Sequence, residues 1–202
     1  KLLKLAETEK INIFGTSAKY IDALSKTEVI SSNSFNLKSV RILCSTGSPL
    51  SPEGYDFIKN NLKPDLQIAS ISGGTDLLSC FVLSNPFDPI VRGEIQCRGL
   101  GMDVDIFDNK GSSLVGQEGE LVCKKPFPSM PIKFWNDTGN ENYKSAYFNV
   151  FEGVWRHGDW AKITDRGTIV IYGRSDTTLN PGGVRIGTAE IYRQVEQLAE
   201  VT

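Results

Sequence analysis

Residues 40–76, VRILCSTGSPLSPEGYDFIKNNLKPDLQIASISGGTD, alternate short apolar runs with one helical segment. The run Val40–Gly47 ends in small polar residues, which is typical of a buried strand, and Leu66–Asp76 repeats that pattern. Between the two runs, Ser51 can cap a helix and Pro52 suits its first position. A strand, a helix and a strand at this spacing predict a βαβ unit with a parallel strand pair.

Both predicted strands run into loops of glycine and small hydroxyl residues. The loops read Ser-Thr-Gly at 45–47 and Ser-Gly-Gly-Thr-Asp at 72–76. Ligands of open α/β sheets bind at the carboxyl ends of the strands. The loops therefore indicate a site for a nucleotide or a small acid. The alternative is that both are plain turns, which have the same residue composition.

The composition excludes several classes of protein. The chain has 202 residues, is 40% hydrophobic and 23% charged, and has a formal net charge of −2. This balance gives no electrostatic case for binding nucleic acid. No apolar run is long enough for a signal peptide or a membrane span, so we expect a cytosolic protein without a membrane partner. The widely spaced cysteines fit reduced thiols better than a zinc site.

After Pro89 the sequence changes to short runs rich in β-branched residues. GEIQCR, DVDIFD, GELVCKK, WAKITD and TIVIYGR, with DNKG and DRG as turns, predict an antiparallel sheet or a small barrel over residues 90–174. The last segment, TAEIYRQVEQLAEV, places Ile191, Val195 and Leu198 on one face of a helix, with Thr188 as its cap. The fold class expected is thus α/β followed by a β-rich part.

Known catalytic motifs are mostly absent. The sequence has no G-x-x-x-x-G-K-[ST] phosphate loop and no G-x-S-x-G elbow, and His157 is its single histidine. A serine hydrolase is therefore disfavoured. The stretch GVWRHGDW at 153–160 contains Asp159, whose carboxylate can accept hydrogen bonds from the two hydroxyls of a ribose. A hairpin turn is the alternative.

Residues 172–191, YGRSDTTLNPGGVRIGTAEI, combine two arginines with much glycine. Arg174 stands at the end of an apolar run and Arg185 follows an irregular loop, so both side chains can meet anionic groups. This pattern indicates a domain junction with anion contacts. A surface linker with two solvated arginines remains the alternative.

Three motifs in this order resemble the acyl-adenylate-forming superfamily: SGGTD, WRHGD and GRSDTTLNPGGVRIGTAEI. The stretches FGTSAKYI at 14–21 and STGSPLSPEG at 45–54 are similar to its branch of acetyl- and acetoacetyl-CoA synthetases. The resemblance implies a partial acyl-adenylate-forming fold. Its expected parts are an incomplete N-terminal α/β subdomain at 1–89, a barrel-like β subdomain at 90–175, and a hinge with the start of a C-terminal α+β domain at 176–202.

The resemblance also implies an activity, the ATP-dependent ligation of acetoacetate to coenzyme A through an acyl-AMP. ATP, Mg²⁺ and coenzyme A are the expected cofactors. The alternatives are a synthetase for another short acid, such as propionate or butyrate, and a truncated nucleotide-binding relative without catalysis. We expect a phosphate loop before Lys1 and a catalytic lysine after Thr202, so that this stretch alone would not form acyl-AMP.

Residue roles implied by the resemblance concern the nucleotide first. Gly47, Ser48 and Pro49 would line the adenine pocket. Asp159 would bind the ribose hydroxyls, and Arg174 would contact ribose and phosphate and stabilise the adenylate.

The other implied roles concern catalysis, the metal and coenzyme A. Thr75 would bond the α-phosphate and Asp76 would hold Mg²⁺. Asp176 would be the hinge of the C-terminal domain, while Gly183 and Arg185 would approach coenzyme A.

The chain departs from the family pattern at two places. Asp76 stands where the family usually has glutamate, one methylene longer. Gly73, followed by Gly74, stands where acetyl-CoA synthetases have a tryptophan that closes the acid pocket. Loss of the indole predicts a larger pocket that suits acetoacetate better than acetate.

Overall fold

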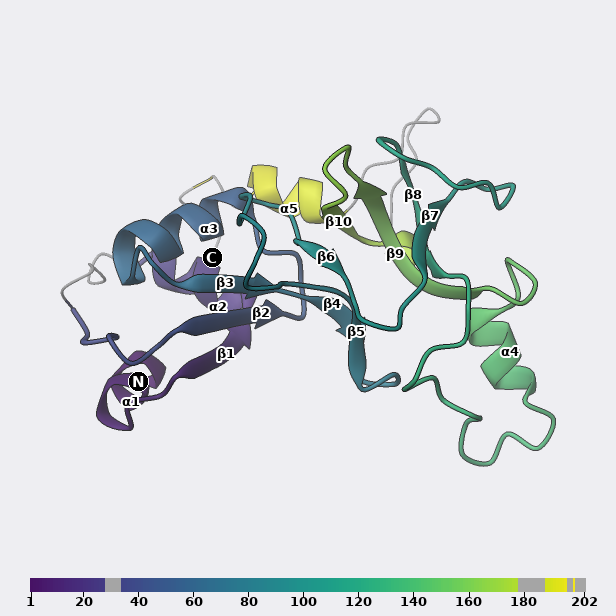
Figure 1. The fold of residues 1–202 in the computed structure, drawn as a ribbon, viewed down its shortest axis with the longest axis horizontal. Coiled ribbons are helices and arrows are strands. Elements are labelled where there is room, and N and C mark those ends of the chain that lie inside the picture. The colour runs from purple at the N-terminus through teal and green to yellow at the C-terminus, as the bar shows by residue number, and fades with distance from the viewer. Residues whose placement is uncertain (28–33, 178–187, 196–197, 199–202) are drawn as a thin grey trace.

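The computed structural model describes residues 1–27, 34–177, 188–195 and 198 (Figure 1). Its strands form a three-stranded sheet β1-β2-β3, a three-stranded sheet β4-β5-β6 and a four-stranded sheet β10-β9-β8-β7. In Figure 1 the first sheet lies at one end of the molecule, the four-stranded sheet lies at the other, and β4–β6 lie between them.

The first sheet is parallel and confirms the predicted βαβ unit. Ser45 of β2 pairs with Ser70 of β3, and β1, which the sequence reading missed, pairs with β2 on the other side. The Ser51 side chain accepts a hydrogen bond from the Gly54 N–H at 3.1 Å, and the helix begins at Pro52 as predicted. The elements of this part are α1 (Leu2–Thr8), β1 (Ile13–Ser17), α2 (Ala18–Ser25), β2 (Ile42–Thr46), α3 (Pro52–Phe57), the π-helical turn η1 (Ile58–Leu62) and β3 (Gln67–Ser70).

The middle sheet corrects the sequence reading at residues 72–76. The first three of these residues are strand β4 rather than loop, and β4 runs antiparallel to β5. Only one residue separates β3 from β4, so the chain passes directly from the parallel sheet into the β-rich part. The strands are β4 (Ser72–Gly74), β5 (Ser79–Leu83) and β6 (Cys97–Arg98).

The four-stranded sheet is antiparallel throughout, as predicted. A bridge between Ile95 and Ile169 of β10 connects it to the segment that precedes β6. Arg174 pairs with Asp159 across β10 and β9, so two predicted site residues are neighbours on adjacent strands. The strands are β7 (Val104–Phe107), β8 (Glu118–Cys123), β9 (Trp155–Ile163) and β10 (Ile169–Arg174).

Three helical segments complete the described chain: α4 (Glu141–Tyr147), the 3₁₀ turn η2 (Ser175–Thr177) and α5 (Thr188–Val195). Helix α4 was not predicted, and its Tyr147 packs against Trp155 of β9. Helix α5 begins at Thr188, the residue that the sequence predicted as the cap of this helix.

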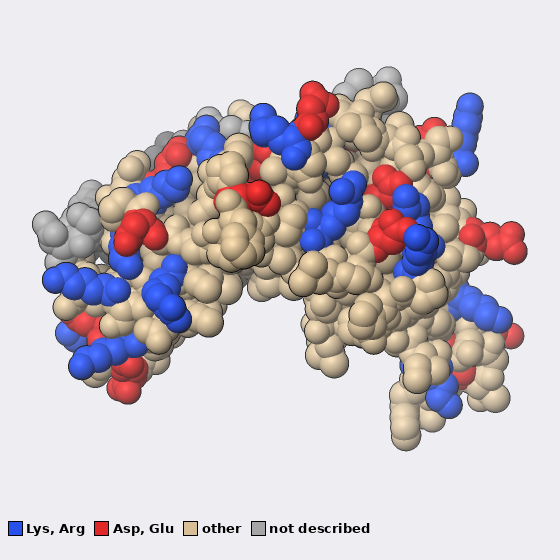
Figure 2. Space-filling model, in the orientation of Figure 1, with Lys and Arg blue, Asp and Glu red and all other residues tan. Residues whose placement is uncertain are grey.

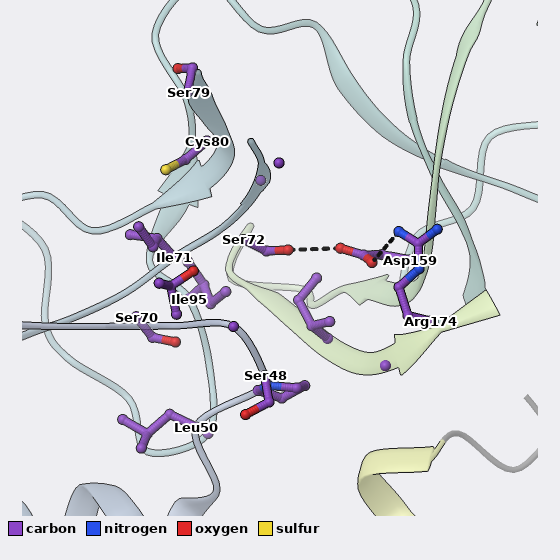
Figure 3. A pocket seen from close by; sticks show the side chains of 18 of the residues that line it. Ser48, Leu50, Ser70, Ile71, Ser72, Ser79, Cys80, Ile95, Asp159 and Arg174 are labelled. Atoms are coloured by element: carbon purple, nitrogen blue, oxygen red, sulfur yellow. Dashed lines mark hydrogen bonds and ion pairs between the residues drawn. The ribbon is translucent and has the colours of Figure 1, made fainter. Parts of the chain in front are cut away.

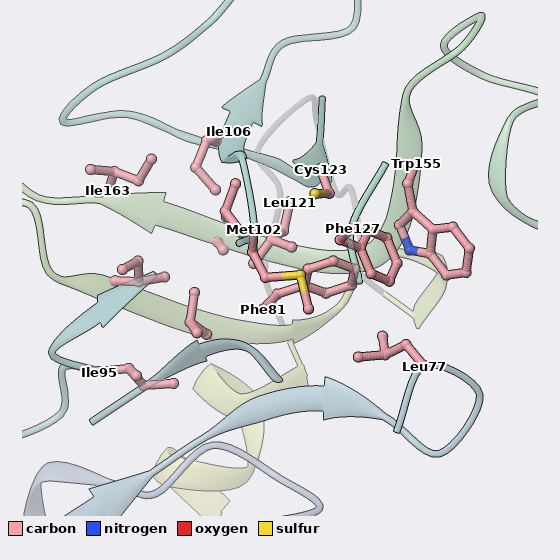
Figure 4. Close-up of a cluster of buried hydrophobic side chains, with 14 of the residues drawn as sticks. Leu77, Phe81, Ile95, Met102, Ile106, Leu121, Cys123, Phe127, Trp155 and Ile163 are labelled. Carbon is pink, nitrogen blue, oxygen red and sulfur yellow. The ribbon is translucent and has the colours of Figure 1, made fainter. Parts of the chain in front are cut away.

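Two separate hydrophobic cores support these sheets. One belongs to the parallel sheet and its helices, with Ile21, Leu43, Ile58 and Ile68 among its most buried members. The other fills the β-rich part, between the middle sheet and the four-stranded sheet (Figure 4). Its buried residues include Leu77, Phe81, Ile106, Leu121, Trp155 and Ile169.

Charges of both signs are interspersed over the face shown in Figure 2, in keeping with the net charge of −2. Within the part of the chain that the structure describes, no helix has the length and apolar character needed to cross a membrane.

Candidate functional site

A cavity of about 510 Å³ opens where the carboxyl ends of β2 and β3 face β9 and β10 (Figure 3). Because Ser45 and Ser70 are paired, the segments that follow them, 46–50 and 71–75, leave the sheet side by side. They form one wall of the cavity. Asp159, Gly173 and Arg174 form the opposite wall.

The cavity brings together most of the predicted site residues. Those lining it are Gly47, Ser48, Pro49, Gly73, Gly74, Thr75, Asp159 and Arg174. Asp176 lies beside it in η2, with its Oδ1 atom 3.5 Å from Arg174 Nε. Asp76 directly follows Thr75 and bonds to Tyr147. Gly183 and Arg185 lie outside the described residues.

Asp159 is the buried charge of this site, with 6% of its surface exposed. Its Oδ2 atom accepts a hydrogen bond of 2.7 Å from Ser72 Oγ and lies 3.8 Å from His157 Nε2. Its Oδ1 atom lies 3.5 Å from Arg174 Nη1. The stretch around Asp159 is the middle of strand β9, so the alternative of a hairpin turn is wrong.

Gly158 leaves room for the Arg174 guanidinium because it has no side chain. Its φ of +86° belongs to the left-handed region, and a Cβ atom there would lie 2.5 Å from Arg174 Nη2. The guanidinium instead passes over the bare backbone, and Nη1 donates to the His157 carbonyl at 3.0 Å. About half of the Arg174 side chain (52%) stays exposed, which leaves it able to meet an anionic ligand.

The backbone of β5 closes off the space around Gly73. A Cβ atom on Gly73 would lie 2.2 Å from the Ser79 carbonyl oxygen and 2.7 Å from Cys80 Cα. Any larger residue would therefore separate β4 from β5. A tryptophan placed here would disrupt the sheet, so the glycine marks close strand packing as well as a position on the cavity wall.

Tyr147 holds the carboxylate of Asp76. Its hydroxyl donates to Asp76 Oδ2, and its ring stacks on Trp155 with centroids 3.6 Å apart and planes 12° apart. Burial, followed by the hydrogen bond to Asp76, raises the pKa of Tyr147 well above its usual value. The phenol therefore stays protonated and can act as a fixed donor to Asp76.

The donor set near Asp76 suits Mg²⁺ bound chiefly through a substrate. Within the described ranges, no three His, Cys, Asp or Glu side chains are grouped so that they could hold a metal ion. Mg²⁺ commonly uses one or two carboxylates together with substrate phosphates and water. A single carboxylate oriented by Tyr147 fits that mode.

Apolar side chains form the deep end of the cavity. Leu50, Tyr55, Ile71 and Ile95 line it, and the Tyr55 hydroxyl donates to the Glu94 carbonyl at 3.0 Å. Burial, with the nearby Glu94 charge, raises the pKa of Tyr55 to about 12. Such a surface suits the flat face of a base or a short acyl chain.

Sequence reasoning assigned no role to Ser72 or Tyr147. Ser72 stood inside the glycine-rich stretch without a role, because its partner Asp159 is 87 residues away. Tyr147 lies 71 residues from Asp76, and no local pattern joins them.

Curated relatives of this chain are acetoacetyl-CoA synthetases. No family model matches the chain. It is 58% identical over 200 residues to acetoacetyl-coenzyme A synthetase of Rhizobium meliloti (strain 1021), which covers 99% of this chain and 31% of that relative. It is 44% identical over 202 residues to acetoacetyl-CoA synthetase of Xenopus tropicalis, covering 100% of this chain and 30% of the relative.

Solved structures show the same likeness. Acetoacetyl-CoA synthetase from Streptomyces lividans superposes with a TM-score of 0.89 at 45% identity, over 98% of this chain and 31% of that one. An anthranilate CoA ligase in complex with anthranoyl-AMP superposes with a TM-score of 0.79 over 97% of this chain and 36% of that one. Its 19% identity makes it evidence for the fold alone.

The fold is therefore that of part of an acyl-adenylate-forming enzyme. Within that class, the chain matches one part of the acetoacetyl-CoA synthetases over nearly its whole length. It spans about 30% of the length of the curated relatives that it matches.

Proposed function

We propose that the full-length protein ligates acetoacetate to coenzyme A. In this reaction the acid attacks the α-phosphate of ATP, pyrophosphate leaves, and the thiol of coenzyme A then displaces AMP from the acyl-AMP. The observation that supports this most strongly is the cavity, because residues from three distant segments, 47–49, 73–75 and 159–174, line one space.

The nucleoside would lie between the two walls of the cavity. The segment Gly47–Pro49 and the apolar deep end would receive the adenine. The Asp159 carboxylate, at the opposite wall, would accept hydrogen bonds from the ribose hydroxyls. Its low exposure strengthens such bonds, because water competes poorly for a buried carboxylate.

The phosphate end would be held by Thr75 and Arg174. The Thr75 hydroxyl would donate to the α-phosphate, and the half-exposed guanidinium of Arg174 would offset the charge that develops there. Asp76, oriented by Tyr147, would contribute one oxygen to Mg²⁺ bound to the phosphates. The metal would supply charge neutralisation at the leaving pyrophosphate.

Acetoacetate would lie near Gly73 and Gly74. Both glycines line the cavity, and neither can carry a side chain without displacing a neighbour. The Cβ position at Gly73 is filled by the β5 backbone, so the glycine itself opens no space toward the acid. The choice of acetoacetate over acetate is supported instead by the relatives, which are acetoacetyl-CoA synthetases.

The remaining assignments concern the end of the chain. Asp176 would be the hinge for a C-terminal domain that begins at about residue 176, and Gly183 and Arg185 would meet the nucleotide of coenzyme A. Asp176 directly follows Ser175, which donates to Glu120 of β8 at 2.9 Å, so its N-terminal side is anchored to the four-stranded sheet.

The test is pyrophosphate release by the full-length protein with ATP, Mg²⁺ and coenzyme A. Acetate, propionate, butyrate and acetoacetate are supplied in turn. We expect the highest kcat/KM with acetoacetate. A higher value with another acid would keep the reaction class and reject the substrate. Nucleotide binding without release with any acid would support the non-catalytic alternative.

A further inference from the structure

Ser72 and Asp159 make a direct contact between two sheets at the cavity wall. The Ser72 hydroxyl on β4 donates to Asp159 Oδ2 on β9 over 2.7 Å, and both residues line the cavity. Figure 3 shows the two side chains pointing toward each other, with Arg174 on the far side of the carboxylate. The hydrogen bond between Ser72 and Asp159 is therefore part of the cavity lining.

A second polar contact between the same strands lies next to the first. His157 Nε2 lies 3.2 Å from the Gly73 carbonyl oxygen. His157 Nε2 also lies 3.8 Å from Asp159 Oδ2, so the two contacts are adjacent in space. β4 would keep this second attachment to β9 if the Ser72 hydroxyl were removed, so the role of the hydroxyl can be tested without separating the strands.

The two oxygens of Asp159 have different partners. Ser72 bonds Oδ2 at 2.7 Å, whereas Arg174 Nη1 lies 3.5 Å from Oδ1. The terminal torsion of an aspartate is broad, so a carboxylate turns easily unless a short hydrogen bond holds it. Ser72 supplies that short bond and thereby fixes the plane of the carboxylate relative to the cavity.

We propose that Ser72 is a positioning residue that orients Asp159 to accept both hydroxyls of the ribose of ATP. The proposal rests on the proposed function, because it takes Asp159 as the ribose ligand. A donor to one oxygen leaves each oxygen a lone pair for a ligand hydroxyl. Receiving two neighbouring hydroxyls together costs less ordering free energy when the carboxylate plane is set beforehand.

The test measures equilibrium binding of ATP, 2′-deoxyATP and 3′-deoxyATP to the full-length protein and its Ser72→Ala variant. We expect Ser72→Ala to raise the Kd for ATP roughly tenfold, the effect of one hydrogen bond to a charged group. The Kd values for the deoxy nucleotides should rise much less. The preference of the wild-type protein for ATP should therefore shrink.

Ser113→Ala is the matched control. Ser113 Oγ donates to Asp105 Oδ2 at 2.6 Å, and Asp105 is as buried as Asp159, but this pair lies away from the cavity lining. Ser113→Ala should leave all three nucleotide affinities unchanged. Ser72→Cys, a close match in size with a weak donor, repeats the test if Ser72→Ala does not fold.

An equal loss of affinity for all three nucleotides in Ser72→Ala would show a structural role and overturn the proposal. Unchanged affinities would overturn it as well. Failure of the proposed function looks different, because the wild-type protein would then bind no ATP or would not distinguish ATP from its deoxy forms.

Discussion

Asp105 and Asp159 are two aspartates that are buried to nearly the same extent but differ in how far their neighbours satisfy the carboxylate oxygens. Asp105 is 7% exposed and Asp159 is 6% exposed, and each accepts a short hydrogen bond from a serine. Asp105 also accepts from the Ile106 N–H at 2.9 Å and pairs with Lys124 Nζ at 2.9 Å. Its neighbours therefore occupy both oxygens at short range.

Asp159 has a short bond on one oxygen and a 3.5 Å contact to Arg174 on the other. It also faces a cavity, whereas Asp105 belongs to β7, where it pairs with Val122 of β8. The difference teaches that burial of a carboxylate does not reveal its role. We propose that Asp159 is the ligand-binding one of the two, because its neighbours leave hydrogen-bonding capacity unused and a cavity gives a ligand access to it.

The largest effect is expected from Asp159→Asn compared with Asp105→Asn. Asp159→Asn should raise the Kd for ATP about 100-fold, because two charge-assisted hydrogen bonds to the ribose are weakened. Asp105→Asn should leave the Kd unchanged and lower the free energy of unfolding by about 2 kcal/mol. Calorimetric titration with ATP and urea unfolding measure both, and equal ATP affinities in the two variants would remove the contrast.

A smaller effect is expected from Gly158→Ala compared with Gly167→Ala. Both glycines have positive φ, +86° and +80°, but a Cβ atom on Gly158 meets Arg174, whereas one on Gly167 meets nothing within 4 Å. Both variants should lose about 1 kcal/mol of stability from backbone strain. Gly158→Ala alone should weaken ATP binding, roughly tenfold, through displacement of the guanidinium. Equal ATP binding by the two variants would contradict this account of Arg174.

Tyr147→Phe tests the carboxylate at the metal end of the cavity. Without the phenol, Asp76 loses its orienting donor, so we expect about threefold more Mg²⁺ to reach half-maximal pyrophosphate release, the effect of one modest hydrogen bond. The control is Tyr143→Phe on the same helix, whose hydroxyl donates to the Pro131 carbonyl at 2.6 Å. An identical Mg²⁺ midpoint in wild type and Tyr147→Phe would refute the role given to Tyr147.

The smallest effect concerns the pH dependence at Asp105. Burial raises its pKa, but hydrogen bonds from Ser113, Lys124 and the Ile106 N–H outweigh burial and hold the pKa below its usual value. The folded state therefore binds this proton more weakly than the unfolded state. The resulting stability is present above the unfolded pKa and is lost as pH falls through the folded pKa.

Ser113→Ala should raise the pKa of Asp105, and the free energy of unfolding at neutral pH should fall by about 1 kcal/mol. That loss should shrink as pH drops through the folded pKa, where wild type loses the same contribution. NMR titration of the Asp105 carboxyl gives the pKa directly. A lower pKa in the variant would contradict the assignment of Ser113 as a donor.

Local patterns predicted the parallel part of the fold well. The apolar runs of β2 and β3, the Ser51 cap and the Pro52 helix start are signals within a few residues, and the structure has all of them. β4 was missed because two of its three residues are glycines, which favour a loop reading. Its pairing with β5 decides its structure, and that pairing is a tertiary contact.

In the candidate site, too, local motifs were predicted and contacts between distant segments were not. Asp159 and Arg174 were found from motifs, and their pairing across β9 and β10 explains how two separate motifs serve one cavity. The contacts on which the proposed roles of Ser72 and Tyr147 rest were not predicted, because they join segments 87 and 71 residues apart. Neither contact has a sequence pattern of its own, since both depend on how sheets and helix α4 pack.

The most direct test is a crystal structure of the full-length protein with an unreactive alkyl ester of AMP that mimics acetoacetyl-AMP. The analogue should occupy the cavity between Gly47–Pro49 and β9, with its ribose hydroxyls on Asp159 and its phosphate near Arg174. An analogue bound elsewhere, or a ribose that does not touch Asp159, would contradict the central claim that this cavity is the adenylate site.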